Sequence, residues 1–199
     1  MFHLNAISDM RRALVRLSVI LSAGLICSCG QEINNSDELT VNESIENKYH
    51  LPKIEIELKI SEYLLNKYRG NDYRDRIKFS YKYVEDFNIF VIYYMSEDIC
   101  GSGGCKLSIV SEKNGELTEL GLINRVVLPI RILKDKRNGY PVFSVVARER
   151  AGLTVRAVAF DRVSFPRWPE DGESWEVKGE DGELLIHNNS KFVVASESR

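Results

Sequence analysis

The sequence has few of the residues on which metal sites and catalytic triads depend. Its 199 residues include three histidines and four cysteines. His3, His50 and His187 lie far apart in the sequence, and no histidine and cysteine group has the spacing of a zinc site. No local grouping of a histidine, a nucleophile and an acidic residue suggests a catalytic triad. We therefore expect a protein without a metal ion, a cofactor or catalytic residues.

The sequence also lacks a strong charge of one sign and lacks repeated long hydrophobic runs. Lys and Arg together number 27 against 29 Asp and Glu, which disfavours nucleic-acid binding because that requires a basic surface. Only residues 17–26 approach the length of a membrane span, which excludes a multi-span membrane protein. A hydrophobic content of 44% excludes a wholly disordered chain. The length fits one globular domain.

What is present at the N-terminus is the organisation of an export signal. Arg11, Arg12 and Arg16 precede the uncharged run of residues 17–26. This run has the length of a signal-peptide core and is short for a permanent anchor. Translation from Met10 in place of Met1 would give a cleaner leader of the same kind.

The end of this leader, Ile-Cys-Ser-Cys-Gly at residues 26–30, resembles the lipobox of bacterial lipoproteins. Ile26 and Ser28 hold the aliphatic and small positions before Cys29, whereas Cys27 would directly follow the bulky Ile26. The resemblance implies cleavage before Cys29, lipid on that cysteine and a place on a bacterial cell membrane or outer membrane, facing the periplasm or the exterior. Several acyl chains anchor a protein stably. An ordinary secretory leader or a short membrane anchor is the alternative.

Three segments follow from these features. We predict a signal peptide at residues 1–28, a flexible tether at 29–48 and a single globular domain at 49–199. The tether is predicted because residues 31–47 are polar, rich in Asn and Ser, and without aromatic residues.

The first segment of the domain fits two patterns. Ile54, Ile56, Leu58 and Ile60 alternate with charged residues as in a strand, but residues 56, 60 and 64 also lie at helical spacing. We predict a helix over 52–69. The alternative is a strand followed by a short helix that Ser61 caps.

The remainder of the domain has the pattern of short strands joined by tight turns. The continuous apolar run of residues 89–95 predicts a central strand buried on both faces, and Asn-Gly at 114–115 and at 138–139 predicts hairpin turns. Strand spacing near ten residues predicts a mainly β fold of α+β leaning, an antiparallel meander with one short N-terminal helix. The predicted strands are 77–83, 89–95, 106–111, 116–123, 129–133, 142–148, 154–160, 175–177, 184–186 and 192–194.

The most distinctive local motif is Cys-Gly-Ser-Gly-Gly-Cys at residues 100–105. In an exported chain, Cys100 and Cys105 are expected to form a disulfide. A nucleophile elbow would need glycine in place of Cys100, a phosphate loop would need a helix after Lys106, and a redox pair would need closer cysteines. The glycine loop still offers backbone N–H groups to an anion or to a partner's carboxylate.

Residues 91–94, this loop, residues 107–110, residues 129–133 and Asn138-Gly139 together resemble a set of uncharacterised exported bacterial proteins. Those proteins carry a Cys-Gly-x-Gly-Gly-Cys loop between two strands, then a proline-initiated strand and an Asn-Gly turn. The resemblance covers residues 77–168 and implies a shape and a compartment but no activity. Many of those proteins have an Asp-x-Asn-Gly-Asp-Gly loop, of which only Asp86 and Asn88 are present here, so a calcium site is not expected.

We predict a lipid-anchored cell-envelope lipoprotein with a non-enzymatic binding or accessory domain, similar to an inhibitor or an immunity protein. Its partners are the membrane, through Cys29, and an envelope protein or cell-wall glycan. The alternative is a wall-active carbohydrate-binding protein or hydrolase that uses surface carboxylates such as Glu170 and Asp171. The predicted binding loop comprises Glu97, Asp98, Gly101, Ser102, Gly103, Gly104 and Lys106, with Trp168 and Trp175 on a second candidate loop.

Overall fold

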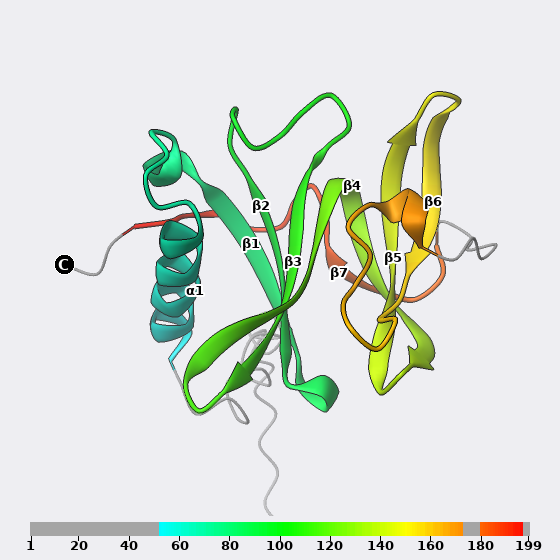
Figure 1. Ribbon diagram of the computed structural model, residues 1–199, viewed down its shortest axis with the longest axis horizontal. Coiled ribbons are helices and arrows are strands. Elements are labelled where there is room, and N and C mark those ends of the chain that lie inside the picture. The colour runs from blue at the N-terminus through cyan, green and yellow to red at the C-terminus, as the bar shows by residue number, and fades with distance from the viewer. Residues whose placement is uncertain (1–51, 173–179, 197–199) are drawn as a thin grey trace, which may run out of the picture. The chain divides into compact units, whose positions relative to one another are not determined.

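The computed structural model describes residues 52–172 and 180–196. The predicted signal peptide, Cys29, the tether and Trp175 lie outside the described residues. Within the described ranges the chain forms one α-helix, three short 3-10 helices and eight strands (Figure 1). In chain order these are α1 (Lys53–Lys67), η1 (Arg74–Arg76), β1 (Lys78–Val84), η2 (Glu85–Phe87), β2 (Ile89–Met95), β3 (Cys105–Lys113), β4 (Glu116–Arg137), β5 (Tyr140–Glu149), β6 (Gly152–Val158), η3 (Pro169–Asp171), β7 (Glu183–Ile186) and β8 (Val193–Val194).

The helical interpretation of residues 52–69 is confirmed by α1. Ile60 and Leu64 are fully buried at helical spacing, whereas Ile54, which strand alternation would place on the same face as Ile60, is 68% exposed. Ser61 is not a cap. It is buried within the helix, whose N-cap is Pro52 without a side-chain capping bond. Burial of one apolar stripe at helical spacing therefore favours a helix over a strand in this segment.

The strands form a mainly antiparallel sheet in the order β6-β5-β4-β3-β2-β1-β8, with β7 paired to β4. Strands β1 to β6 are adjacent in chain order, so the predicted meander is confirmed. Both Asn-Gly pairs form hairpin turns with positive φ, at 55° and 84° for Asn114 and Gly115 and at 50° and 84° for Asn138 and Gly139. These values match the left-handed turn that suits the strand twist.

The prediction of two separate strands at 116–123 and 129–133 is wrong, because β4 runs without interruption from Glu116 to Arg137. Pro129 lies inside this strand although it cannot donate a ladder hydrogen bond. It is tolerated because the pairing with β5 is irregular between Val127 and Arg131. The first part of β4 pairs with β3, and the later part pairs with β5 and β7. The predicted strand at 175–177 lies outside the described residues.

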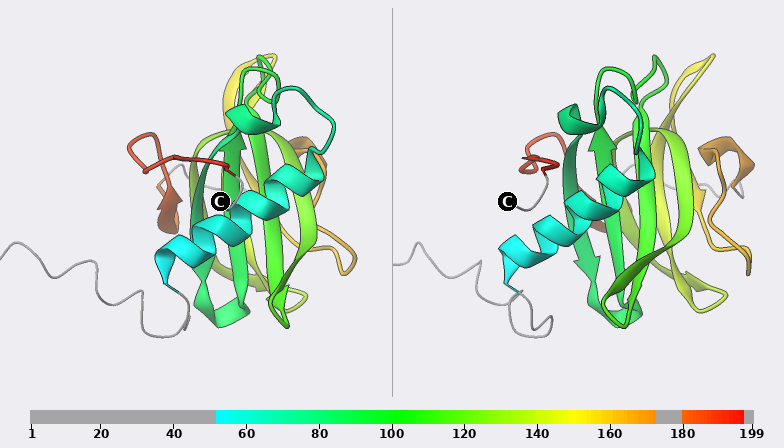
Figure 2. Two further views of the ribbon diagram at one scale, coloured as in Figure 1. Left: turned by 90° about the vertical axis from the view of Figure 1, so that its left-hand side faces the viewer. Right: turned by 60° about the vertical axis from the view of Figure 1, so that its left-hand side comes forward.

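The central strand β2 is buried on both faces, as predicted. Ile89, Val91 and Tyr93 point into one core together with residues of β4 and β5. Phe90, Ile92 and Tyr94 point into a second core beneath α1. Figure 2 shows the helix lying across the strands β1 to β3. The meander is thus packed on both sides at β2. The connection from β2 to β3 places Ile99 in the core beneath α1 and Cys105 against the other core.

Candidate functional site

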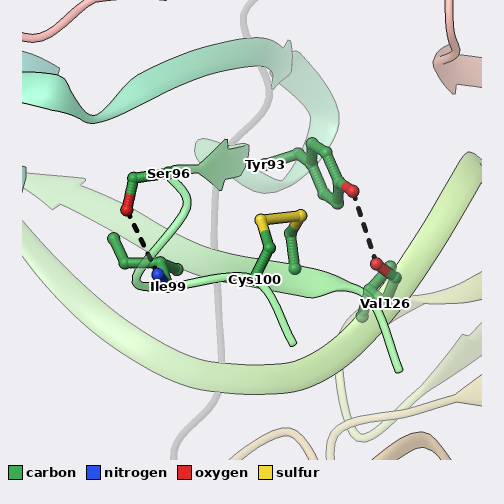
Figure 3. Close-up of a disulfide and its surroundings, with 6 residues drawn as sticks. Tyr93, Ser96, Ile99, Cys100 and Val126 are labelled. Atoms are coloured by element: carbon green, nitrogen blue, oxygen red, sulfur yellow. Dashed lines mark hydrogen bonds between the residues drawn. A yellow bond between two sulfur atoms is a disulfide. The ribbon is translucent and has the colours of Figure 1, made fainter. Parts of the chain in front are cut away.

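The loop of residues 100–105 is closed by the expected disulfide (Figure 3). The sulfur atoms of Cys100 and Cys105 are 2.03 Å apart. Inside the ring, Gly101 and Gly104 form an isolated antiparallel bridge in which each N–H donates to the other's carbonyl at 3.1 Å. Ser102 is exposed at the tip. The N–H groups of Gly101 and Gly104 are therefore used within the loop and do not point outward, contrary to our expectation.

The loop packs directly against β4. A Cβ atom on Gly103 would lie 2.5 Å from Arg125 Nε, and one on Gly104 would lie 2.4 Å from the carbonyl oxygen of Val126. Gly104 also has φ of +124°, which residues with side chains rarely adopt. The Tyr93 hydroxyl donates to the Val126 carbonyl at 3.4 Å, as Figure 3 shows. Gly104 is thus needed for the close approach between the loop and the backbone of β4, whereas Gly103 meets only the flexible Arg125 side chain.

A β-bulge places Arg125 at this contact. Cys105 pairs with Val126 and Leu107 pairs with Ile123, so two residues of β4 lie opposite Lys106 alone. Arg125 has φ of 62°, in the left-handed region that is unfavourable for a residue with a long side chain. Bulges re-aim side chains in this way. The guanidinium group, half exposed, lies 3.5 Å from a Glu170 carboxylate oxygen.

The segment around η3 joins the same place. The backbone N–H and the side-chain amide of Asn124 both donate to the Arg167 carbonyl, at 2.9 and 3.2 Å. The Arg167 guanidinium lies 5.6 Å from the centre of the Trp168 ring, which is half-buried. The disulfide loop and Trp168, predicted as separate sites, therefore adjoin the same bulge of β4. We call Ser102, Arg125, Arg167 and Trp168 the bulge surface.

The other predicted loop residues lie toward the helix. The Asp98 carboxylate accepts a hydrogen bond from Arg76 of η1 at 3.0 Å, and Glu97 is exposed. Lys106 donates to the Tyr68 hydroxyl of the helix C-terminus at 3.2 Å and lies over that ring. The residues predicted as one binding loop are thus divided in the structure. Asp98 and Lys106 lie toward α1, and Ser102 belongs to the bulge surface.

Sequence reasoning missed Arg125 and Arg167. A signal for the bulge was present, because the apolar residues Ile123 and Val126 flank the polar pair Asn124-Arg125 at a spacing of three, whereas residues on one face of a regular strand have an even spacing. The structure buries both of them in one core. No comparable signal marks Arg167, since its position depends on the tertiary contact with Asn124.

A second group that the sequence did not indicate lies between α1 and the sheet. The Glu119 carboxylate accepts hydrogen bonds from Tyr63 at 2.5 Å, from Ser108 at 3.1 Å and from Lys67. The Tyr94 hydroxyl is 3.3 Å from Ser108 Oγ and 3.2 Å from the Tyr68 hydroxyl. These side chains come from α1, β2, β3 and β4, which explains why no local motif revealed them.

The electrostatics of this group follow from burial and mutual hydrogen bonding. Burial, together with the bond to Glu119, raises the pKa of Tyr63, and burial raises that of Tyr94. Partial burial raises the pKa of Glu119, but hydrogen bonds from Lys67 and Tyr63 outweigh it and hold the pKa below the ordinary value. Lys67 Nζ is 3.3 Å from Ser108 Oγ, but Ser108 is 0% exposed and offers no access to a substrate. The group is therefore suited to structural hydrogen bonding.

Other places in the described part of the chain carry less chemistry. A cavity of about 480 Å³ lies beside the outward side of α1, between Glu62, Arg69 and Ser196, and none of the predicted site residues lines it. Among residues 52–172 and 180–196 no cluster of three His, Cys, Asp or Glu side chains suits a metal ion, and no helix there is long and apolar enough to span a membrane.

No family model matches the chain, and neither a curated protein nor a solved structure matches it. The resemblances to lipoproteins and to exported proteins with a Cys-Gly-x-Gly-Gly-Cys loop therefore stay predictions from the sequence.

Proposed function

We propose that the protein is a lipid-anchored component of a bacterial cell envelope whose domain binds another envelope protein without catalysis, as an inhibitor or immunity protein does. The observation that carries this proposal is the rigid disulfide loop braced against the bulge of β4, with Ser102 exposed at its tip. A pre-ordered loop loses little entropy on binding, and contacts with partners are frequently made by loops on a firm scaffold.

The proposed location rests on two features. The lipobox-like leader supplies the anchor on Cys29, and the disulfide suits an oxidising compartment outside the cytoplasm. In cells supplied with labelled palmitate, the wild-type chain should carry the label and Cys29→Ala should not. Equal labelling of the two chains, or none in either, would remove the anchor from the proposal.

The alternative of a glycan-binding or glycan-cleaving protein has less support in the geometry. Sugar binding by stacking needs a free aromatic face, and the Arg167 guanidinium occupies one face of the half-buried Trp168 ring. Of the carboxylates named for hydrolysis, neither Glu170 nor Asp171 lines the cavity beside α1. A protein partner is therefore the better-supported ligand.

Site-specific photo-crosslinking tests the binding function. A benzophenone amino acid replaces Ser102 in the full-length chain, and the matched control replaces Ala151, which is exposed in the hairpin turn between β5 and β6. Irradiated cells should give a discrete adduct from position 102 in the membrane fraction and none from position 151. Adducts of the same pattern from both positions, or from neither, would contradict a specific partner at this loop.

A further inference from the structure

Arg125 has a backbone conformation that is unfavourable for a long side chain, which indicates a role beyond maintaining the fold. Five described residues other than glycine have positive φ, and three of them are Asn88, Asn114 and Asn138. Asparagine tolerates this conformation better than a long side chain does. Glycine would fit the bulge without strain. An arginine there is a backbone outlier of the kind that gathers at binding sites.

The surroundings present this arginine to solvent in a defined direction. Its side chain lies against Gly103, whose lack of a Cβ leaves the space that Arg125 Nε occupies, so the disulfide loop supports the arginine side chain. Its guanidinium is half exposed, and its contact with Glu170, at 3.5 Å, is long for a charge-assisted hydrogen bond. Guanidinium groups suit two-pronged recognition of a carboxylate. Glu170 therefore occupies loosely the position that a partner's carboxylate would take.

A second cation and an aromatic ring complete the surface. Arg167 is exposed, its guanidinium faces Trp168, and its carbonyl is fixed by Asn124, the neighbour of Arg125. Arginine and tryptophan are the residues that most often dominate protein–protein binding energy. Positive side chains select a partner of opposite charge.

We propose, on the basis of the binding function above, that Arg125 is the specificity-determining contact of the bulge surface and that the partner presents an acidic protein segment whose carboxylate replaces Glu170 at Arg125.

Peptide selection with the full-length protein tests this inference. The chain, held in a non-ionic detergent, is immobilised and panned against a random-peptide library, and enriched peptides are titrated by fluorescence anisotropy. We expect peptides rich in Asp and Glu. Affinity should fall about tenfold or more in Arg125→Gly, as loss of a dominant interface arginine predicts. Arg125→Lys should also bind more weakly because lysine lacks the two parallel N–H donors of a guanidinium group. Glu170→Gln should bind at least as tightly as wild type.

The control is Arg162→Gly. Arg162 is also an exposed arginine with positive φ, at 100°, but it contacts Asn138 at the hairpin turn between β4 and β5. It should bind peptide like the wild type. Arg125→Gly relieves the strained backbone, so its melting temperature should not fall. If it does fall, Arg125→Asn, which tolerates the left-handed conformation, replaces it in the titration.

Three outcomes overturn the inference in distinguishable ways. If acidic peptides bind Arg125→Gly and the wild type equally, Arg125 is not the specificity-determining contact, while the proposed binding function is unaffected. Polygalacturonate, an acidic glycan, is the second probe. If no peptide is enriched and polygalacturonate binds the wild type but not Arg125→Gly, the partner is an acidic glycan and not a protein. No binding of either probe to the wild type would overturn the inference, while an adduct at Ser102 in cells would still support the binding function itself.

Discussion

The two faces of the strands β1 to β3 bury different chemistry. The face toward β4, β5 and β7 is lined mainly by apolar residues, and the buried hydroxyl groups that β1 to β3 place there are those of Tyr93 and its cross-strand partner Ser80. The face beneath α1 buries Tyr68, Tyr94 and Ser108 in addition to apolar residues, and these connect to Lys67 and Glu119 at its edge. Burial of apolar area does not depend on protonation, whereas a hydrogen-bonded carboxylate contributes only while it is ionised. The first face should therefore contribute stability that does not change with pH, and the second should make stability depend on pH.

The largest expected effect is on the apolar face. Phe143 is fully buried and its ring lies 5.7 Å from that of Phe165. Phe143→Ala leaves a cavity and should lower the free energy of unfolding by about 3 to 5 kcal/mol, measured by urea denaturation. Leu153→Ala, at an exposed leucine of β6, is the control and should change little. A loss below about 1 kcal/mol at Phe143 would show that this core is loosely packed.

The disulfide gives the next effect. Cys105 packs against the apolar core, and its bond with Cys100 closes a short loop. Cys105→Ser should lower the free energy of unfolding by about 2 kcal/mol through the entropy of the unfolded chain. Reducing the wild-type protein should give a similar loss, and the same reductant should leave Cys105→Ser unaffected. If Cys105→Ser leaves the free energy of unfolding unchanged, the disulfide does not stabilise the fold and only shapes the bulge surface.

The comparison also explains how far the sequence could be interpreted. The two-faced β2, the Asn-Gly turns and the meander follow from local patterns. The continuity of β4 through Pro129 does not, because it depends on which neighbour pairs with each part of the strand. Glu119, in an exposed stretch of β4, joins the hydrogen-bonded group at the edge of the helix-side core only when α1 brings Tyr63 and Lys67 against it. Such features depend on contacts between residues more than forty positions apart.

The helix-side face should be sensitive to acid through Glu119. Its pKa in the folded protein lies below the ordinary value of 4.5, so it stabilises the fold at neutral pH. This contribution is lost as the pH falls from 4.5 through the folded-state pKa. Glu119→Gln should cost about 1 kcal/mol at pH 7 and should lose less stability than the wild type on acidification. Melting curves across this range measure both. Glu116→Gln, at an exposed carboxylate of the same strand, should follow the wild type, and an equal acid loss in Glu119→Gln would assign the acid sensitivity elsewhere.

The smallest effect is the sharpest comparison, because two adjacent tyrosines of β2 point to opposite faces. The Tyr94 hydroxyl has two buried partners, Tyr68 and Ser108, whereas the Tyr93 hydroxyl has a single long bond of 3.4 Å to the Val126 carbonyl. Tyr94→Phe should therefore cost about 1 kcal/mol more than a typical exposed change, since it removes two buried hydrogen bonds, although Tyr68 and Ser108 keep their bonds to Lys106 and Glu119. Tyr93→Phe should cost less than about half of that. Urea denaturation at neutral pH compares the two. If Tyr93→Phe is the more costly, the bond to Val126 is a main support of the disulfide loop, and the apolar face is the one that depends on a hydrogen bond.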